Sequence, residues 1–291
     1  MVDTHTTQLN SVENVTIKLP TKVVAPNDKI TKKIFSVDSA SLNRGRIQVI
    51  EGRTKLPVLV DFMTEDFEKI EPYTREVAMA CFNIFEHGNI YATTEQIYRV
   101  MTGDIKARLS AKAEKKILES LQRLIVSPIR LDISNLRTLK YQTTKSELIG
   151  TLLPAQFVTN VIVNGSTAKT VVKFLAESPI VTVAKIKNNQ LLTYDLANVA
   201  VGGSNSAERI ALRNYTLRRI EECRLHVQLK NVVTFDDLFR KNHLLDRRKE
   251  EKLRYRKYLK ACFDEWKATD VIADYQIIFK DKSPYEIAFS F

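Results

Sequence analysis

A short motif occurs twice in this 291-residue chain, at residues 93–99 and again at residues 234–240. The copies read TTEQIYR and TFDDLFR, and both follow the pattern Thr, any residue, acid, Gln or Asp, aliphatic, aromatic, Arg. Each copy opens with a helix-starting signal, because a Thr side chain caps free N–H groups and the residue three positions later reaches back. Each copy also follows an amphipathic stretch and precedes a basic one. The repeat therefore predicts a helix, a short helix and a basic helix, twice in the same order.

The first unit is expected to contain three helices followed by a two-stranded hairpin, which is the order of a winged helix. Gly88 is expected to end the first helix, Thr93 to begin the second, and Ser110 to cap the third. One face of each longer helix is apolar and is expected to be buried. In the third helix this face consists of Ala113, Ile117, Leu121, Leu124 and Ile125. The expected helices cover residues 74–86, 93–101 and 110–125, and the expected strands cover residues 129–133 and 147–153.

The second unit repeats this order towards the end of the chain. Four apolar residues at helical spacing indicate its first helix, and residues 234–243 form its short second helix. Asp246 is expected to cap a long third helix that reaches about Ala268. Residues 271–279 and 285–291 read as the two strands of a wing. The four apolar residues of the first helix are Ile210, Leu217, Ile220 and Leu225.

These units predict an α+β fold of two tandem winged-helix domains related by an internal repeat. The N-terminal domain is expected to cover residues 46–201 and the C-terminal domain residues 207–291. The Gly-Gly-Ser-Asn-Ser segment at residues 202–206 separates them and has the composition of a linker. Residues 1–45 show weak periodicity and are expected to form a flexible N-terminal arm.

A hairpin insertion is expected within the N-terminal domain, at about residues 155–175. Asn164 and Gly165 form a dipeptide that is a strong signal for a two-residue hairpin turn. The apolar runs 161–163 and 171–174 flank this dipeptide and are expected to be the paired strands.

The composition points to an anionic partner. The net charge is +11 with 44% hydrophobic residues, and the pI is about 9.4. A basic surface without a polyanionic partner remains an alternative. No apolar run approaches the roughly 20 residues needed to span a bilayer, and Met1–Asn10 lacks the apolar core of a signal peptide, so a cytoplasmic location is expected. The three distant cysteines are expected to be reduced and buried.

The predicted third helix of the second unit carries the strongest candidate site. Residues 246–260 hold eight Lys or Arg residues and three acids, a net charge of 8 − 3 = +5. Tyr255, Leu259, Cys262, Phe263 and Trp266 fall on one helical side, with the cations largely on the other. The Arg fork pairs with phosphate or guanine at two points, so DNA contact is expected, whereas a solvated charged face is the alternative. The candidate DNA-binding residues are Arg247, Arg248, Lys249, Arg254, Arg256, Lys257 and Lys260.

A weaker basic cluster surrounds the start of the third helix of the first unit. Its five cations oppose one acid, Glu114, for a net charge of 5 − 1 = +4. The N-terminal end of a recognition helix is the part that enters the major groove. The wing adds three cations that are candidates for backbone contact, or that belong to an ordinary solvated loop. The candidates are Lys106, Arg108, Lys112, Lys115 and Lys116 at the helix, and Arg137, Lys140 and Lys145 in the wing.

Signatures of catalysis are weak. The segment GSTAKT at residues 165–170 lacks two glycines of a phosphate loop and lies in a predicted hairpin. The histidines and cysteines do not cluster at metal-ligand spacing. Asp236 and Asp237 follow Thr234 directly and are explained as acids at a helix start. The chain is therefore expected to be no enzyme and to need no metal or other cofactor.

The motifs resemble those of plasmid and mobile-element replication initiators built from two winged-helix domains. The resemblance lies in residues 94–103, the 113–124 helix, residues 215–220 and the basic helix 246–266. In order and length it extends over about residues 60–291. The long arm and the hairpin insertion depart from the family pattern.

The resemblance implies a protein that binds repeated double-stranded sites at an origin, helps to open the duplex and recruits host replication proteins such as the helicase. It also implies that the C-terminal domain makes the stronger sequence-specific contacts. A homodimer that represses its own gene is a second form implied by the family.

Three other functional classes remain open from the sequence. A transcriptional regulator uses the same two modules and also binds specific DNA without catalysis. A nickase or nuclease predicts metal-dependent cleavage of DNA. A structural or protein-binding scaffold predicts no salt-dependent affinity for DNA.

Overall fold

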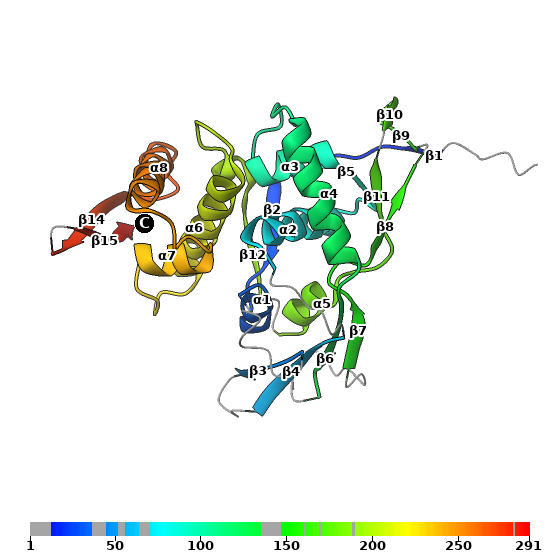
Figure 1. Ribbon diagram of the computed structural model, residues 1–291, viewed down its shortest axis with the longest axis horizontal. Helices are drawn as coiled ribbons and strands as arrows, with labels where there is room; N and C mark the ends of the chain where they lie inside the picture. Colours follow the sequence, from blue (N-terminus) through cyan, green and yellow to red (C-terminus); the bar gives the residue numbers. More distant parts are fainter. Residues whose placement is uncertain are drawn as a thin grey trace, which may run out of the picture.

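The computed structural model describes residues 13–36, 45–51, 56–63, 70–134, 147–159, 161–168, 170–187, 190–281 and 283–291. These residues form a mixed α+β fold in which helices pack against several small, mostly antiparallel sheets (Figure 1). None of the helices in these ranges is both long and apolar enough to cross a bilayer.

Helix α2 (Pro72–Glu86) is the central element of the first half. The sequence predicts a helix with one buried face, but the structure buries every residue from Pro72 to Ile84. The helix lies between α3 (Thr94–Thr102) and α4 (Ala111–Ile125) on its own side and α6 (Ala207–Leu225) of the second half. Elements of both halves therefore surround α2, although the sequence predicts an amphipathic helix here.

The predicted start of α3 is confirmed. The backbone N–H of Gln96 donates to Thr93 Oγ1 at 3.2 Å, and the N–H of Thr93 donates to Gln96 Oε1 at 2.8 Å, which completes a capping box. Gly103 ends the helix at φ 71°, where a Cβ atom would lie 2.5 Å from the backbone nitrogen of Ala200. Only glycine fits this position, because the chain turns left-handed against another backbone. Ser110 caps α4 as predicted.

The strands predicted after α4 exist as β6 (Pro128–Asp132) and β7 (Glu147–Thr151) and pair with each other. They belong to a four-stranded antiparallel sheet of order β3–β4–β6–β7, at the bottom of Figure 1. Its other strands are β3 (Arg46–Glu51) and β4 (Leu56–Phe62).

A different sheet accompanies the helices of the first half. The short strand β5 (Tyr91–Thr93), which leads into α3, pairs with β11 (Val171–Phe174), and β11 pairs with β8 (Ala155–Val158). The strand before the short helix therefore finds its partner in the predicted insertion and not in β6 or β7. The alternation of apolar residues predicts a strand, but it carries no information about the partner strand.

The turn at Asn164 and Gly165 is confirmed, with positive φ values of 50° and 79°. It joins β9 (Val161–Val163) to β10 (Ser166–Ala168), so the expected pairing of residues 161–163 with residues 171–174 is wrong. A two-residue turn returns the chain at once, and the nearest strand is therefore the partner. On its other side β9 pairs in parallel with β1 (Glu13–Val15).

The expectation of a flexible arm is wrong for residues 13–36. Strand β2 (Lys22–Pro26) pairs with β12 (Leu191–Asp195), and Asp28 caps α1 (Lys29–Ile34) through the N–H groups of Ile30 and Thr31. Helix α5 (Pro179–Ile186) begins after its N-cap Ser178 and packs near α1. The segment is ordered because its apolar side chains enter the core, namely Val23, Ala25, Ile30, Ile34 and Phe35.

The second half follows the predicted order with several local corrections, among them the bounds of both wing strands. Helix α8 (Lys249–Ala268) has Arg248 and not Asp246 at its N-cap, and the Arg248 N–H donates to Glu251 at 3.2 Å. The short helix ends at Lys241 and not at His243. Leu225 at the end of α6 is 59% exposed and not buried. The remaining elements are β13 (Val232–Thr234), α7 (Phe235–Lys241), β14 (Asp274–Lys280) and β15 (Ser283–Ser290), with sheet order β13–β15–β14.

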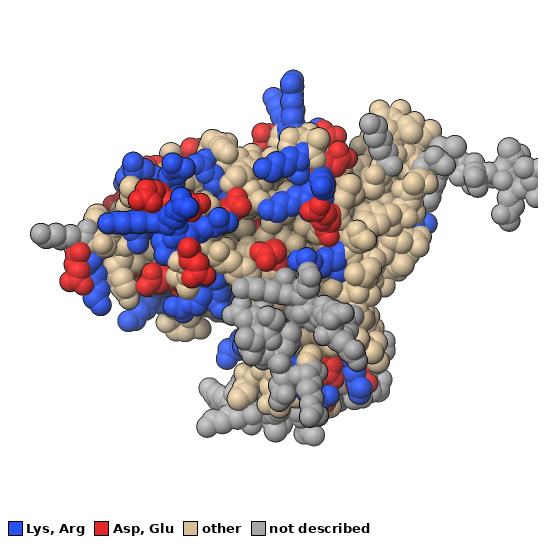
Figure 2. All heavy atoms as spheres, viewed as in Figure 1, with Lys and Arg blue, Asp and Glu red and all other residues tan. Residues whose placement is uncertain are grey.

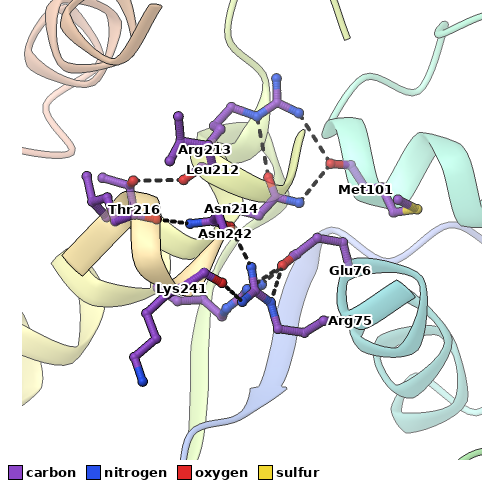
Figure 3. Close-up of polar contacts among 11 residues, drawn as sticks. Arg75, Glu76, Met101, Leu212, Arg213, Asn214, Thr216, Lys241 and Asn242 are labelled. Atoms are coloured by element: carbon purple, nitrogen blue, oxygen red, sulfur yellow. Dashed lines mark hydrogen bonds and ion pairs between the residues drawn. The ribbon is translucent and has the colours of Figure 1, made fainter. Parts of the chain in front are cut away.

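The two halves share one hydrophobic core, although the 202–206 segment joins them at the surface. The main polar contact between them is Glu76 on α2, which accepts two hydrogen bonds from Arg218 on α6, both at 2.6 Å. Figure 3 shows Glu76 beside Arg75. Arg75 donates to the same carboxylate at 2.8 Å and reaches Asn242 beyond α7 at 3.0 Å. Asn214 donates to the Met101 carbonyl at 3.0 Å. Helices of both halves are thus fixed at one relative position.

The charge on Glu76 is maintained by these partners. Burial by itself raises the pKa of this carboxyl, but the nearby Arg218 and Arg75 outweigh burial and hold the pKa below its ordinary value of 4.5. A carboxyl whose pKa is lowered by folding adds stability above its unfolded pKa, and this stability is lost as the pH falls through the folded pKa.

We expect Glu76→Gln to lower the free energy of unfolding by about 3–5 kcal/mol at pH 7, because two buried guanidinium groups lose their counter-charge. The difference from wild type should shrink as the pH falls below about 4.5, since the carboxyl is protonated first in the unfolded chain and only at a lower pH in the folded protein. Urea denaturation between pH 3 and pH 8 measures both effects. Glu147→Gln, which breaks a surface pair with Arg130, is the control and should change little. A pH-independent difference would contradict the assignment.

Candidate nucleic-acid interface

One side of α8 is buried in the second half, much as predicted. Leu259, Cys262, Phe263 and Trp266 are buried, and the Trp266 indole donates to the Asn198 carbonyl at 2.9 Å. Tyr255 is only half-buried, whereas the buried Tyr258, which the sequence analysis missed, completes the face. Helical spacing indicates that Tyr258 shares this face, because residue 258 lies one turn before Cys262.

The opposite side of α8 presents cations to solvent. Lys249, Arg254 and Lys257 are exposed, and no ion pair joins them to any residue in the part of the chain that the structure describes. Arg248 is also exposed, at the N-cap. Two other cations have acidic partners, since Arg247 lies 3.7 Å from Glu251 and Lys260 lies 2.9 Å from Asp264. The unpaired positive charge therefore gathers on the first half of the helix.

Arg256 does not belong to this exposed face. Its guanidinium lies over the rings of Phe235 and Phe239 on α7, at 5.3 and 5.8 Å from the ring centroids, and its side chain is half-buried. The Nε atom is buried. Its prediction as an outward-facing residue is wrong, because the residue sits at the edge of the helix, where α7 covers it.

The cations around the start of α4 are all exposed. Lys106 and Arg108 lie in the segment that enters the helix, and Lys112 lies in its first turn. Lys115 is 3.9 Å from Glu119, and Lys116 lies over the ring of Tyr73 at 5.1 Å. The structure thus brings the five predicted residues of this cluster together at one helix end. The predicted wing residues Arg137, Lys140 and Lys145 lie outside the described residues.

The two basic clusters lie on one face of the molecule. Figure 2 shows Lys and Arg side chains gathered over the region of α8 and again over the region of α3 and α4, with acidic side chains between them. Because the two halves share a core, the spacing between these clusters is set by the fold.

An open groove of about 610 Å³ lies beside the start of α4. It runs between the start of α3, the segment that enters α4, and the β9–β10 hairpin. The sequence analysis did not identify this groove, because it forms between segments about 60 residues apart. The Asn164–Gly165 turn was its one sequence signal.

Two kinds of catalytic group can be checked in the structure, namely metal ligands and cysteine thiols. Among the described residues, no group of three His, Cys, Asp or Glu residues is arranged to bind a metal ion. The three cysteines are buried and unpaired, and burial raises the pKa of the Cys262 thiol to about 11.

No protein-family model matches the chain, and no curated protein matches its sequence. Two crystal structures of domains 2 and 3 of RctB, one of them a selenomethionine form, share a similar arrangement with a TM-score of 0.43. They are 9% and 10% identical, and the match covers 89% of this chain and 98% and 97% of theirs. A likeness at this level does not assign the chain to a family.

We expect Arg256→Ala to lower the free energy of unfolding by about 1–2 kcal/mol, because the guanidinium and its methylene stem pack on two Phe rings. Arg254→Ala removes an exposed side chain from the same helix and should leave stability unchanged. Thermal unfolding of the two variants measures the contrast. Equal stability of both variants would show that Arg256 faces solvent.

Proposed function

We propose that this protein is a non-enzymatic, sequence-specific double-stranded DNA-binding replication initiator built from two winged-helix units. It binds repeated sites at an origin, helps to open the duplex and recruits host replication proteins. One observation carries this proposal. In each half a helix with a buried apolar side presents exposed cations at its start, and both helix starts lie on one face of the molecule.

The second half supports the winged-helix assignment in its order of elements. The order is α6, β13, α7, α8, β14 and β15, and the short strand β13 pairs with the last strand β15. In a helix-turn-helix the last of the three helices lies in the major groove, and this position belongs to α8. The hairpin β14–β15 then corresponds to the wing.

The first half supports a second unit with a modified sheet. Its order of α2, β5, α3 and α4 matches that of α6, β13, α7 and α8. The partner of β5 is β11, so the sheet β5–β11–β8 takes the position that β13–β15–β14 takes in the second half. Helix α4 is then the reading helix, with Lys106, Arg108 and Lys112 at its start.

The chemistry of the exposed cations favours binding to duplex DNA. Lys and Arg neutralise phosphates and release counterions, and Arg also reads guanine in the major groove. Two reading helices held at one spacing by a single chain do not need a two-fold partner. Such an arrangement suits direct repeats better than the inverted sites of symmetric dimers.

Nuclease footprinting of the full-length protein on the DNA around its own gene, at near-physiological salt, tests the proposal. Protection of several evenly spaced direct repeats beside an A·T-rich stretch is the expected result. A single inverted site over the promoter would indicate a regulator instead. Absence of protection would remove sequence-specific DNA binding from the function.

We expect the double variant Arg254→Ala/Lys257→Ala to weaken binding to any duplex and to reduce the slope of log affinity against log salt by about two, one for each lost phosphate contact. If either side chain reads a base, the binding free energy for the cognate site should weaken by a further ~1–3 kcal/mol relative to random DNA. Fluorescence anisotropy over a salt series measures both.

The matched control is Lys29→Ala/Lys33→Ala on α1, which removes the same charge from exposed positions away from α4 and α8. This control should retain the wild-type slope. Equal slopes for both double variants would mean that α8 is outside the interface.

A further inference from the structure

The β9–β10 hairpin forms one wall of the groove beside α4. The proposed DNA-binding function gives this hairpin no role. The opposite wall consists of the start of α3 and the segment that enters α4. In Figure 1 the hairpin projects at the top of the molecule, on the same side as the segment between α3 and α4. The lining of the groove includes Arg108, one of the cations at the start of α4.

Three sets of contacts hold the hairpin in place. The Asn164 side chain accepts from the Ile17 N–H at 2.9 Å and donates to the Ile17 carbonyl at 3.1 Å. Strand β1 pairs along the other edge of β9. A small separate hydrophobic cluster underlies the hairpin and consists of Ile17, Tyr91, Val161, Val163 and Val171.

The groove is lined by hydrogen-bonding groups. Ser166 and Thr167 on β10 are exposed, and no hydrogen bond joins either hydroxyl to another group in the described parts of the chain. Across the groove, Arg108 is exposed as well. The lining includes Thr94, Arg99, Arg108, Ser166, Thr167 and Thr170.

The acids in the groove are already engaged. Glu95 accepts from Arg99 at 2.8 Å, and Glu114 accepts from the Thr94 hydroxyl at a longer 3.4 Å. Two carboxylates thus balance the charges of Arg99 and Arg108 in the lining, and among the described residues the donors left open to a ligand are the Arg108 guanidinium and the hydroxyls of Ser166 and Thr167. Ser, Thr and Arg donors are the groups that bind phosphate and sugar oxygens of DNA.

We propose that this groove holds the sugar–phosphate backbone of the duplex that α4 contacts, with the β10 hydroxyls on one side and Arg108 on the other. The hairpin then acts as an additional wing that positions the first unit on DNA without reading sequence. This inference rests on the proposed function, because it requires α4 to face a duplex.

The first test uses Thr167→Glu in the full-length protein, with a mixed-sequence 30-base-pair duplex as the probe. A carboxylate against phosphates should weaken affinity by about tenfold or more at low salt. Thr167→Ala removes one neutral hydrogen bond and should weaken it by about twofold to tenfold. Gln156→Glu adds the same charge at an exposed position on β8 outside the groove lining, and it should bind like wild type.

The second test maps proximity. All three native cysteines are buried, so Thr167→Cys provides one accessible thiol for an iron–EDTA reagent that cuts nearby DNA. The tethered reagent should cleave the duplex from position 167 and not from a matched Gln156→Cys variant. Circular dichroism of each variant establishes that the fold is retained.

The outcomes separate this inference from the function on which it rests. Wild-type affinity of Thr167→Glu, an equal loss in Gln156→Glu, or equal cleavage from both thiols would overturn the hairpin contact. If Arg254→Ala/Lys257→Ala still weakens binding in that case, the proposed function stands. A wild-type protein that binds no duplex would overturn both.

Discussion

The relative position of the two halves depends on one buried carboxylate, that of Glu76. Glu76 lies on α2, the helix that both halves surround, and its two oxygens are held by Arg218 from α6 and by the neighbouring Arg75. Burying these charges costs free energy, and a buried ion pair gives little net stability compared with apolar residues of similar size. Its effect here is on specificity, because a shift of α6 along α2 separates Glu76 from Arg218 and leaves the Arg218 guanidinium buried without its carboxylate. The hydrophobic core supplies the attraction between the halves, and Glu76 fixes their register.

The arrangement of the basic surface follows from this register. Helix α8 is tied to the first half through Trp266, and α4 packs on the same helix that carries Glu76. The starts of α4 and α8 therefore keep a fixed separation on one face, although more than 100 residues separate them in the chain. A rigid pair of cationic helix ends suits a long, regular polyanion, and duplex DNA is a polyanion of this kind. The long N-terminal segment contributes by pairing β1 with the β9–β10 hairpin and β2 with β12.

The sequence predicted local features well, because short-range physics determines them. The capping box at Thr93, the cap at Ser110 and the turn at Asn164 and Gly165 all occur where they were predicted. Helical periodicity also located most of the buried side of α8. The α8 N-cap was misplaced by two residues, because Glu251 satisfies the backbone N–H of Arg248 and Asp246 does not. Arg256 was misassigned because a helical wheel ignores what the neighbouring helix α7 covers.

By itself, the sequence determined the repeated order of elements, the ends of most helices and the positive charge on two of them. These properties depend on residues within a few positions of each other, so side-chain type and spacing are enough to define them. Only the tertiary structure decided that β5 pairs with β11, that residues 13–36 join the fold, and that Glu76 is buried against Arg218. Strand pairing and buried ion pairs depend on which distant residues the complete fold brings into contact. A local sequence pattern does not contain this information.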